Sequence, residues 1–279
     1  MPAGSSKGET MPSGFMQHEK NGLVYMTAGV IGAKHAFSTR YGGVSEGDFS
    51  SLNLGFNRGD EAEKVLENYR RLGDATGIDT MHADYTNQVH GNVVRIATEE
   101  DRRLPNSHES VECDGLVTVT PGLAIFCFTA DCVPVLLHDP VRGAAGAVHC
   151  GWKSSVQDIL GVAVETLRGL GSEPENIRAA LGPAIGAGNF ETDSDVPDAL
   201  RAWLGHDAEE YIYSGITPGK YNVDLRGANA RRLMQLGVRR ENIAVSAECT
   251  IESHEKYWSH RYTSKHGLKR GSQCAVIEL

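Results

Sequence analysis

The chain has 279 residues, of which 40% are hydrophobic and 23% charged, so it is long enough and apolar enough to bury a substantial core. Its formal net charge of -9 argues against nucleic acid or an anionic membrane as a partner but leaves room for a local basic pocket that binds one small anion. No apolar run reaches the length of a membrane span, and the polar N-terminus lacks the apolar core of a signal peptide. Six cysteines without an export signal predict reduced thiols and a cytoplasmic location.

The pattern along the chain predicts a disordered tail over residues 1–20 and one domain over residues 21–279. The first part of this domain is predicted to form two strands, a glycine-rich loop and a helix, in the order 23–27, 34–39, 40–60 and 62–77. The loop is long enough that a binding role is a reasonable expectation.

Short strands dominate the middle of the chain and are predicted over residues 92–98, 115–120, 123–129, 133–138, 144–149, 177–182 and 243–247. The turn DPVRG at 139–143 predicts a hairpin on its two sides. Helices are predicted over 154–171 and 224–237, the second with Asp224 as its N-cap. Because strands and helices mix without strict alternation, the fold class is predicted to be α+β rather than a doubly wound sheet.

Three reactive side chains interrupt the strand-like sequence. Cys132 and His149 lie at corresponding ends of the predicted hairpin, which brings such positions near each other. His90 precedes Gly91 at a turn before another strand. Two imidazoles and a thiolate are good zinc ligands, and three protein ligands leave a position for water or substrate.

The same residue types allow two other interpretations. Cys132 with His149 as its base also suits a cysteine hydrolase acting on an amide, such as a cell-wall precursor. A His2Cys set also binds copper, although no methionine lies within residues 128–154 to act as a weak axial ligand. A non-catalytic metal-binding or partner-regulating protein is a third possibility, which a turnover measurement would separate from both enzymes.

A series of ordered blocks from about residue 30 to the end resembles the YfiH-like family, also called laccase-domain or multicopper polyphenol oxidase proteins. The blocks are RYGGVS (40–45), SLNLG (51–55), QVHG (88–91), CDGLVT (113–118), TADCVPVLL (129–137), VHCGW (148–152), LGPAIG (181–186), CT (249–250) and YWSHR (257–261). The resemblance implies mixed β-sheets covered by helices, similar to the cytotoxic necrotizing factor fold. It also implies a zinc or copper site made of His90, Cys132 and His149.

Family members are understood as purine nucleoside phosphorylases. The resemblance therefore implies that adenosine, inosine, guanosine and methylthioadenosine react with phosphate to give a free base and a sugar 1-phosphate, with adenosine deamination as a second activity. A copper-dependent polyphenol oxidase is the older alternative. Two blocks depart from the family pattern: Lys153 replaces an arginine after H-x-G-W, and GLKRG with Arg270 replaces a C-terminal T-G-R.

Several polar residues are candidates for substrate contact or proton transfer. Arg40 lies in the glycine-rich loop and is the first candidate for phosphate, ahead of Lys153 and Arg261. Asn53 and Gln88 are candidates for the ribose or the base, or each could cap a turn. Deamination by an activated water needs a carboxylate to move the proton, for which the candidates are Asp131 and Asp114. Asp131 could instead cap a turn and order the backbone of Cys132. The chain is expected to be a monomer or a homodimer.

Overall fold

Two six-stranded sheets packed face to face form the centre of the molecule. A computed structural model describes residues 14–56, 58–107 and 111–279. The first sheet has the order β1 (Phe15–Lys20), β2 (Leu23–Ala28), β3 (Lys34–Ser38), β15 (Gln273–Glu278), β7 (Ala124–Thr129) and β4 (Asp84–Tyr85). The second has the order β14 (Ile243–Val245), β10 (Arg178–Leu181), β8 (Val133–Asp139), β9 (Ala144–Cys150), β6 (Gly115–Thr118) and β5 (Val94–Ile96).

Both sheets mix parallel and antiparallel neighbours. The parallel pairs are β4 with β7, β5 with β6, and β10 with β14. The α+β prediction, with mixed sheets covered by helices, is confirmed by this arrangement.

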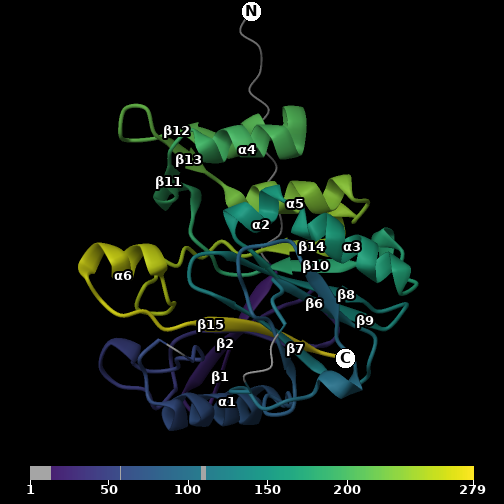
Figure 1. Cartoon of the computed structure of the whole chain (residues 1–279), viewed down its shortest axis with the longest axis vertical. Coiled ribbons are helices and arrows are strands. Elements are labelled where there is room, and N and C mark those ends of the chain that lie inside the picture. The colour runs from purple at the N-terminus through teal and green to yellow at the C-terminus, as the bar shows by residue number, and fades with distance from the viewer. Residues whose placement is uncertain (1–13, 57, 108–110) are drawn as a thin grey trace, which may run out of the picture.

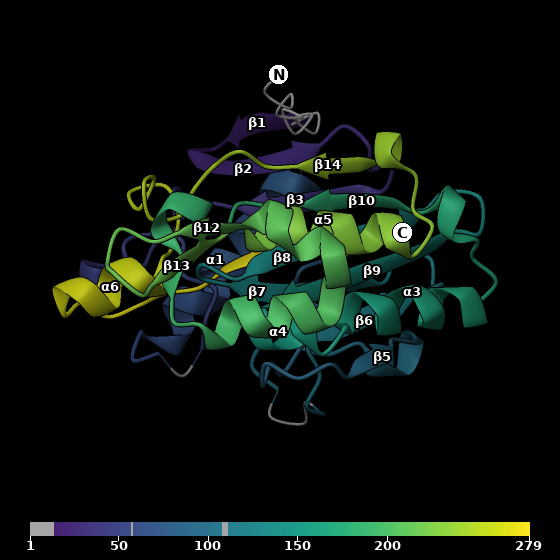
Figure 2. The same cartoon turned by 90° about the horizontal axis from the view of Figure 1, so that it is seen from above.

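Helices cover the two outer faces of this pair of sheets. Helix α1 (Ala62–Thr76) packs on the first sheet, while α3 (Ile159–Gly169) and α5 (Leu225–Gln235) pack on the second (Figure 1). A third apolar cluster lies between the sheets, with Phe37 and Ile125 from one and Leu136 from the other. Seen from above, the strands of the second sheet run beneath α5 (Figure 2).

The hairpin β8–β9 is buried on both faces because apolar clusters lie on each side of it. This explains its nearly continuous apolar sequence, which a strand with one solvated face would not show. Small residues at 144–147 let the flanking layers approach closely.

A small three-stranded sheet lies at one end of the molecule. It has the order β11 (Glu191–Thr192), β13 (Tyr221–Val223) and β12 (Ile212–Ser214), and α4 (Asp195–Leu204) packs beside it. The remaining α-helices are α2 (Trp152–Val156) and α6 (His260–His266). Short 3-10 turns occupy Gly47–Phe49, Glu99–Asp101, Pro174–Asn176, Ala187–Asn189, Gly205–Tyr211 and Arg240–Asn242.

Two sequence-based expectations require correction. Part of the expected disordered tail forms β1, which pairs with β2 from Phe15 to Lys20, while residues 1–13 lie outside the described residues. The helix expected over 154–171 is two helices, α2 and α3, because Asp158 adopts a left-handed backbone with φ 64° between them. The predictions that Gly77 ends α1 and that Asp224 caps α5 are confirmed.

Candidate metal centre and cavity

The hairpin β8–β9 places two of the candidate ligands. Pro134 pairs with His149 and Val133 with Cys150, so Cys132, one residue before β8, lies next to the end of β9. The imidazole of His149 is buried, and the thiol of Cys132 is half-buried.

Asp114 fixes the third candidate ligand and orients the second. Its carboxylate accepts hydrogen bonds from the backbone N–H groups of residues 89, 90 and 91 at 3.0, 3.0 and 2.9 Å. This holds His90 in a left-handed conformation with φ 60°, which is uncommon for a residue with a Cβ. The same carboxylate lies 2.7 Å from Nδ1 of His149, which leaves Nε2 of that ring to bind a ligand.

The three side chains converge on one point. Their ligand atoms all lie within 4.8 Å of one another, and Nε2 of His90 is 3.9 Å from Sγ of Cys132. A Cβ at Gly151 would lie 2.9 Å from His90 Cδ2 and 3.3 Å from Cys132 Sγ, so glycine leaves this space open. Two imidazoles and a thiolate around a space kept clear by glycine fit a zinc or copper ion.

The charges of the centre are strongly coupled. Burial disfavours the Cys132 thiolate, yet His149 and His90 outweigh it and lower the pKa of the thiol to about 6. Burial likewise disfavours the charged imidazole of His149, but the Cys132 thiolate and Asp114 raise its pKa to about 9. Burial opposes ionisation of Asp114 too, while hydrogen bonds from His149 and the backbone lower its pKa. The pair thus favours a deprotonated thiol, as metal binding requires, while the protonated imidazole of His149 must release its proton to bind a metal.

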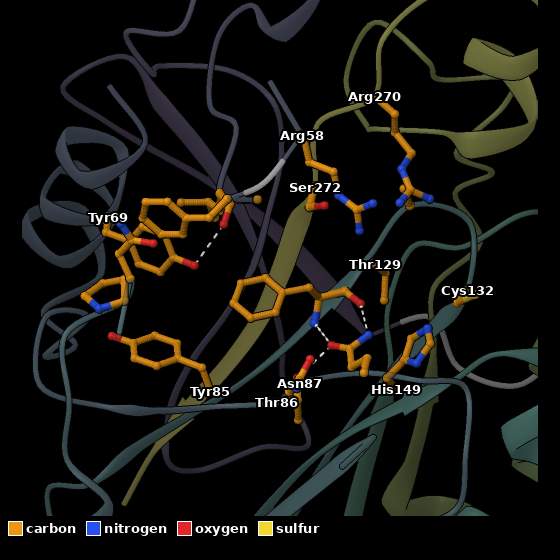
Figure 3. Close-up of a pocket in the computed structure, with 18 of the residues that line it drawn as sticks. Arg58, Tyr69, Tyr85, Thr86, Asn87, Thr129, Cys132, His149, Arg270 and Ser272 are labelled. Atoms are coloured by element: carbon orange, nitrogen blue, oxygen red, sulfur yellow. Dashed lines mark hydrogen bonds between the residues drawn. The ribbon is translucent and has the colours of Figure 1, made fainter. Parts of the chain in front are cut away.

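The candidate ligands lie at one end of a cavity of ≈ 520 Å³. Figure 3 shows Cys132 and His149 at this end and Tyr69 and Tyr85 at the other. Phe56 and Phe128 extend the aromatic wall, and Arg58, Arg270, Ser272 and Thr129 line the side nearest the metal centre. The volume suits a drug-sized ligand with aromatic and anionic parts.

Residues 34–279 match the family model described as multi-copper polyphenol oxidoreductase laccase. The chain belongs to this family. It is 39% identical over 259 residues to a Deinococcus radiodurans protein named purine nucleoside phosphorylase, a match covering 92% of this chain and 94% of that protein. It is 32% identical over 257 residues to purine nucleoside phosphorylase YlmD of Geobacillus stearothermophilus, covering 90% and 93%.

Solved structures show the same relationship. The crystal structure of YlmD from Geobacillus stearothermophilus aligns with a TM-score of 0.88 at 32% identity, covering 96% of this chain and 99% of that one. The structure of hypothetical protein YfiH from Bacillus licheniformis aligns with a TM-score of 0.85 at 30% identity, covering 94% and 97%. The resemblance to the YfiH-like, laccase-domain family is therefore confirmed. In the described part of the chain, no helix combines the length and apolarity needed to cross a bilayer.

Two of the residues predicted to contact substrate, Gln88 and Asn53, have carboxamides that are already hydrogen-bonded to neighbouring residues of the chain. Gln88 lines the cavity, but its carboxamide bonds both the N–H and the C=O of Phe128, at 2.6 and 2.7 Å. Asn53 is fully buried, and its carboxamide bonds Gly55, Asp60 and Ser272.

Three other candidates, Arg40, Lys153 and Arg261, do not line the cavity. The guanidinium of Arg40 lies 3.9 Å from the ring centroid of Trp258 and donates to the carbonyls of Ser50 and His254. Lys153 is exposed on α2, and Arg261 donates to the carbonyl of Glu191.

The carboxylate of Asp131 is engaged by residues outside the metal centre. It accepts hydrogen bonds from the hydroxyl of Thr250 and the backbone N–H of Arg261, both at 2.6 Å. Its backbone has φ 90°, so Asp131 fixes the turn that precedes Cys132. This geometry agrees with the turn-ordering alternative for Asp131.

The cavity also contains residues that the sequence did not single out for a role. Arg58 follows the SLNLG block within the glycine-rich loop, and Arg270 lies in GLKRG. The sequence signal that could have identified them as site residues was their position close to the motifs shared with the family. Thr129 begins the TADC block, and its Oγ1 is buried without a hydrogen-bond partner among the described residues.

Proposed function

We propose that the protein is a zinc-dependent purine nucleoside phosphorylase. The observation that supports this most strongly is an open three-ligand group, His90, Cys132 and His149, at the end of a cavity large enough for a nucleoside. Relatives named purine nucleoside phosphorylase cover nearly the whole chain. The proposed substrates are adenosine, inosine, guanosine and methylthioadenosine, each with phosphate.

The proposed reaction exchanges one bond at the sugar. An oxygen of hydrogen phosphate forms a bond to C1′ while the C1′–N9 bond breaks, and its electron pair leaves with the purine. The proton of hydrogen phosphate ends on the purine, so the products are a free base and a sugar 1-phosphate. The partly buried rings of Phe56 and Phe128, which pack against the buried Tyr69 and Tyr85, line the cavity and are placed to pack against a purine ring.

When bound, zinc supplies a Lewis acid and lowers the pKa of a coordinated water. This chemistry also supports the proposed second activity, in which adenosine and water give inosine and ammonia. His149 is oriented for metal binding by Asp114, and His90 by its backbone bonds to the same carboxylate. Among the described residues one ligand group of this kind is present, which favours a mononuclear reaction over multicopper oxidation. All six cysteines are free thiols, in keeping with a proposed cytoplasmic location.

Product analysis tests the proposal. Incubation with adenosine and phosphate is expected to yield adenine and ribose 1-phosphate, with inosine from deamination. His90→Ala is expected to lose zinc and phosphorolysis together. Full phosphorolysis by a metal-free His90→Ala protein would overturn the proposal.

A cysteine hydrolase is the second candidate, and one observation favours it. Cys132, His149 and Asp114 form a chain of nucleophile, base and orienting carboxylate, with the thiol pKa lowered to about 6. For this function Cys132→Ala would abolish amide hydrolysis while His90→Ala retained it. The opposite requirement for His90 separates the two candidates.

A further inference from the structure

Two arginines that line the cavity have no hydrogen-bond acceptor among the described residues. The guanidinium groups of Arg58 and Arg270 make no hydrogen bond or ion pair with any residue that the structure describes, although both line the cavity. Arg103, which lines the same cavity, is by contrast paired with Asp84 and the carbonyl of Tyr85. In a chain with a net charge of -9, two cations left without an acceptor beside a candidate metal centre indicate a site for an anion.

The surrounding structure fixes the two segments that carry these arginines relative to each other. Asn53 accepts the backbone N–H of Gly55 at 2.9 Å and that of Ser272 at 3.0 Å. It therefore joins the loop that carries Arg58 to the segment that carries Arg270. Asn53 and Ser272, the two residues of this link, are 219 residues apart in the sequence. Since Asn53 is fully buried, this link is built into the core beneath the cavity.

Two hydroxyl groups border the same space. A Cβ at Gly55 would lie 2.7 Å from Ser272 Oγ and 3.3 Å from Arg58 Cγ, so these two side chains approach each other at Gly55. Thr129 on β7 is 4% exposed, and its Oγ1 has no partner in the described structure. Figure 3 shows Thr129 between the arginines and the Cys132–His149 end of the cavity.

The electrostatic effect of the two arginines on each other and on their neighbours also indicates a site for an anion. Burial and the neighbouring Arg58 both lower the pKa of Arg270, while Cys132 and Asp131 oppose this. The same two arginines help to lower the pKa of the half-exposed His260, after burial. A bound dianion would offset this repulsion and accept the fork of N–H donors that each guanidinium presents.

We infer that Arg58 and Arg270, with the hydroxyls of Thr129 and Ser272, form a phosphate subsite beside the metal centre. This inference rests on the proposed function for its choice of ligand, and it assigns phosphate to residues other than Arg40, Lys153 and Arg261. The shared chemistry is a phosphate group, which inorganic phosphate or the phosphate of a nucleotide would supply.

Binding of inorganic phosphate to the metal-loaded protein tests the subsite directly by calorimetry. Arg58→Gln and Arg270→Gln are each expected to weaken phosphate binding about 10- to 100-fold, the effect of losing a charge-assisted pair. Arg168→Gln is the matched control, because it removes the same charge from an exposed ion pair on α3 and is expected to bind phosphate like the wild type. Gly55→Ala keeps both arginines but intrudes on Ser272 and Arg58, so it is also expected to weaken binding.

Steady-state rates separate the inference from the proposed function. The arginine variants are expected to raise the KM for phosphate and to leave the KM for adenosine within about twofold, since they bind only the anion. Folded, metal-loaded variants with wild-type phosphate affinity and KM would overturn the subsite, while phosphorolysis by the wild type would stand. A different outcome is also informative: the wild type binds phosphate but shows no phosphorolysis, and both variants lose the phosphate binding. That result would support the subsite and overturn the proposed function.

Binding measurements with AMP and adenosine identify whether the phosphate group comes from inorganic phosphate or from a nucleotide. Inorganic phosphate that binds alone, with AMP no tighter than adenosine, supports the subsite as inferred for a free co-substrate. AMP that binds more tightly than adenosine through both arginines, with no binding of free phosphate, overturns that assignment in favour of nucleotide recognition.

Discussion

At the scale of single residues, a side chain added at Gly151 would contact all three candidate ligands of the metal centre. An added Cβ there would crowd the His90 ring at 2.9 Å and the Cys132 sulfur at 3.3 Å. We expect Gly151→Ala to lower zinc affinity at least about tenfold, because a small displacement of ligands spoils a tetrahedral site. Competition with a chromophoric chelator measures this.

Gly169→Ala provides the control for that prediction, since a Cβ at Gly169 in α3 would meet no atom within 4 Å. It is expected to retain zinc and to stabilise the fold by up to about 1 kcal/mol. Unchanged zinc affinity in Gly151→Ala would show that the three side chains do not share an ion.

Asp114 supports the centre without being one of its three proposed ligands. Asp114→Asn replaces the anionic acceptor of His149 Nδ1 and disturbs the N–H groups that hold residues 89–91. We expect zinc affinity to fall about 10- to 100-fold, as is usual when the orienting partner of a ligand is lost. An affinity within twofold of the wild type would contradict this positioning role.

The spatial neighbours of some of these site residues could be predicted from the sequence, and those of others could not. Cys132 and His149 could be paired from sequence because a tight hairpin joins their strands. The partners of Asn53 could not, since its bond to Ser272 spans 219 residues and depends on how the loops fold over β15. For the same reason the sequence singled out Arg40 of the glycine-rich loop and not Arg58, although Arg40 donates to backbone carbonyls and Arg58 lines the cavity.

At the scale of elements, the break between α2 and α3 shows what periodicity misses. Apolar spacing continues through residues 154–171, but Asp158 leaves the helical conformation and binds Arg232 at 2.6 and 2.7 Å and the Trp203 indole at 3.0 Å. These partners come from α5 and α4, so the break depends on tertiary contacts. The long strands and α1 were predicted correctly because their patterns are local.

Asp158→Asn tests the contribution of this charge. Asparagine tolerates the left-handed backbone, so the substitution changes mainly the ion pair. Burial alone would raise the pKa of Asp158, but hydrogen bonds from Arg232 and Trp203 lower it. Because the folded pKa is depressed, the stabilisation is present above the unfolded pKa of about 3.9 and is lost as pH falls through the folded value.

We therefore expect Asp158→Asn to lower the free energy of unfolding at pH 7 by about 1 kcal/mol, a modest value because the carboxylate is about a third exposed. The difference between the two proteins is expected to shrink below about pH 4. Denaturant titrations at a series of pH values measure it. A difference that grew on acidification would contradict the assignment.

At the scale of the whole molecule, the C-terminal strand lies in the middle of the first sheet. β15 pairs with β3 on one side and β7 on the other, and Ile277 is fully buried between the sheets. The sheet is therefore complete only when β15 pairs with strands from much earlier in the sequence. For this reason we propose that the predicted domain over residues 21–279 forms one folding unit, together with the edge strand β1.

Removal of residues 273–279 is expected to abolish folding, because β3 and β7 each lose one of their two partner strands and gain an exposed edge. Circular dichroism and solubility report the loss. Ile277→Ala is the graded counterpart, expected to fold but to lose about 2–5 kcal/mol of stability. A soluble truncated protein with cooperative unfolding would contradict this role of β15.

The central claim is that His90, Cys132 and His149 hold one zinc ion on which nucleoside phosphorolysis depends. The most direct measurement pairs metal stoichiometry with phosphate-dependent release of adenine from adenosine in one preparation, before and after chelation. We expect about one zinc per chain, as three convergent ligands imply, and we expect chelation to remove the zinc and the adenine release together, with recovery of both on adding zinc. Adenine release that persists in fully metal-free protein would contradict it.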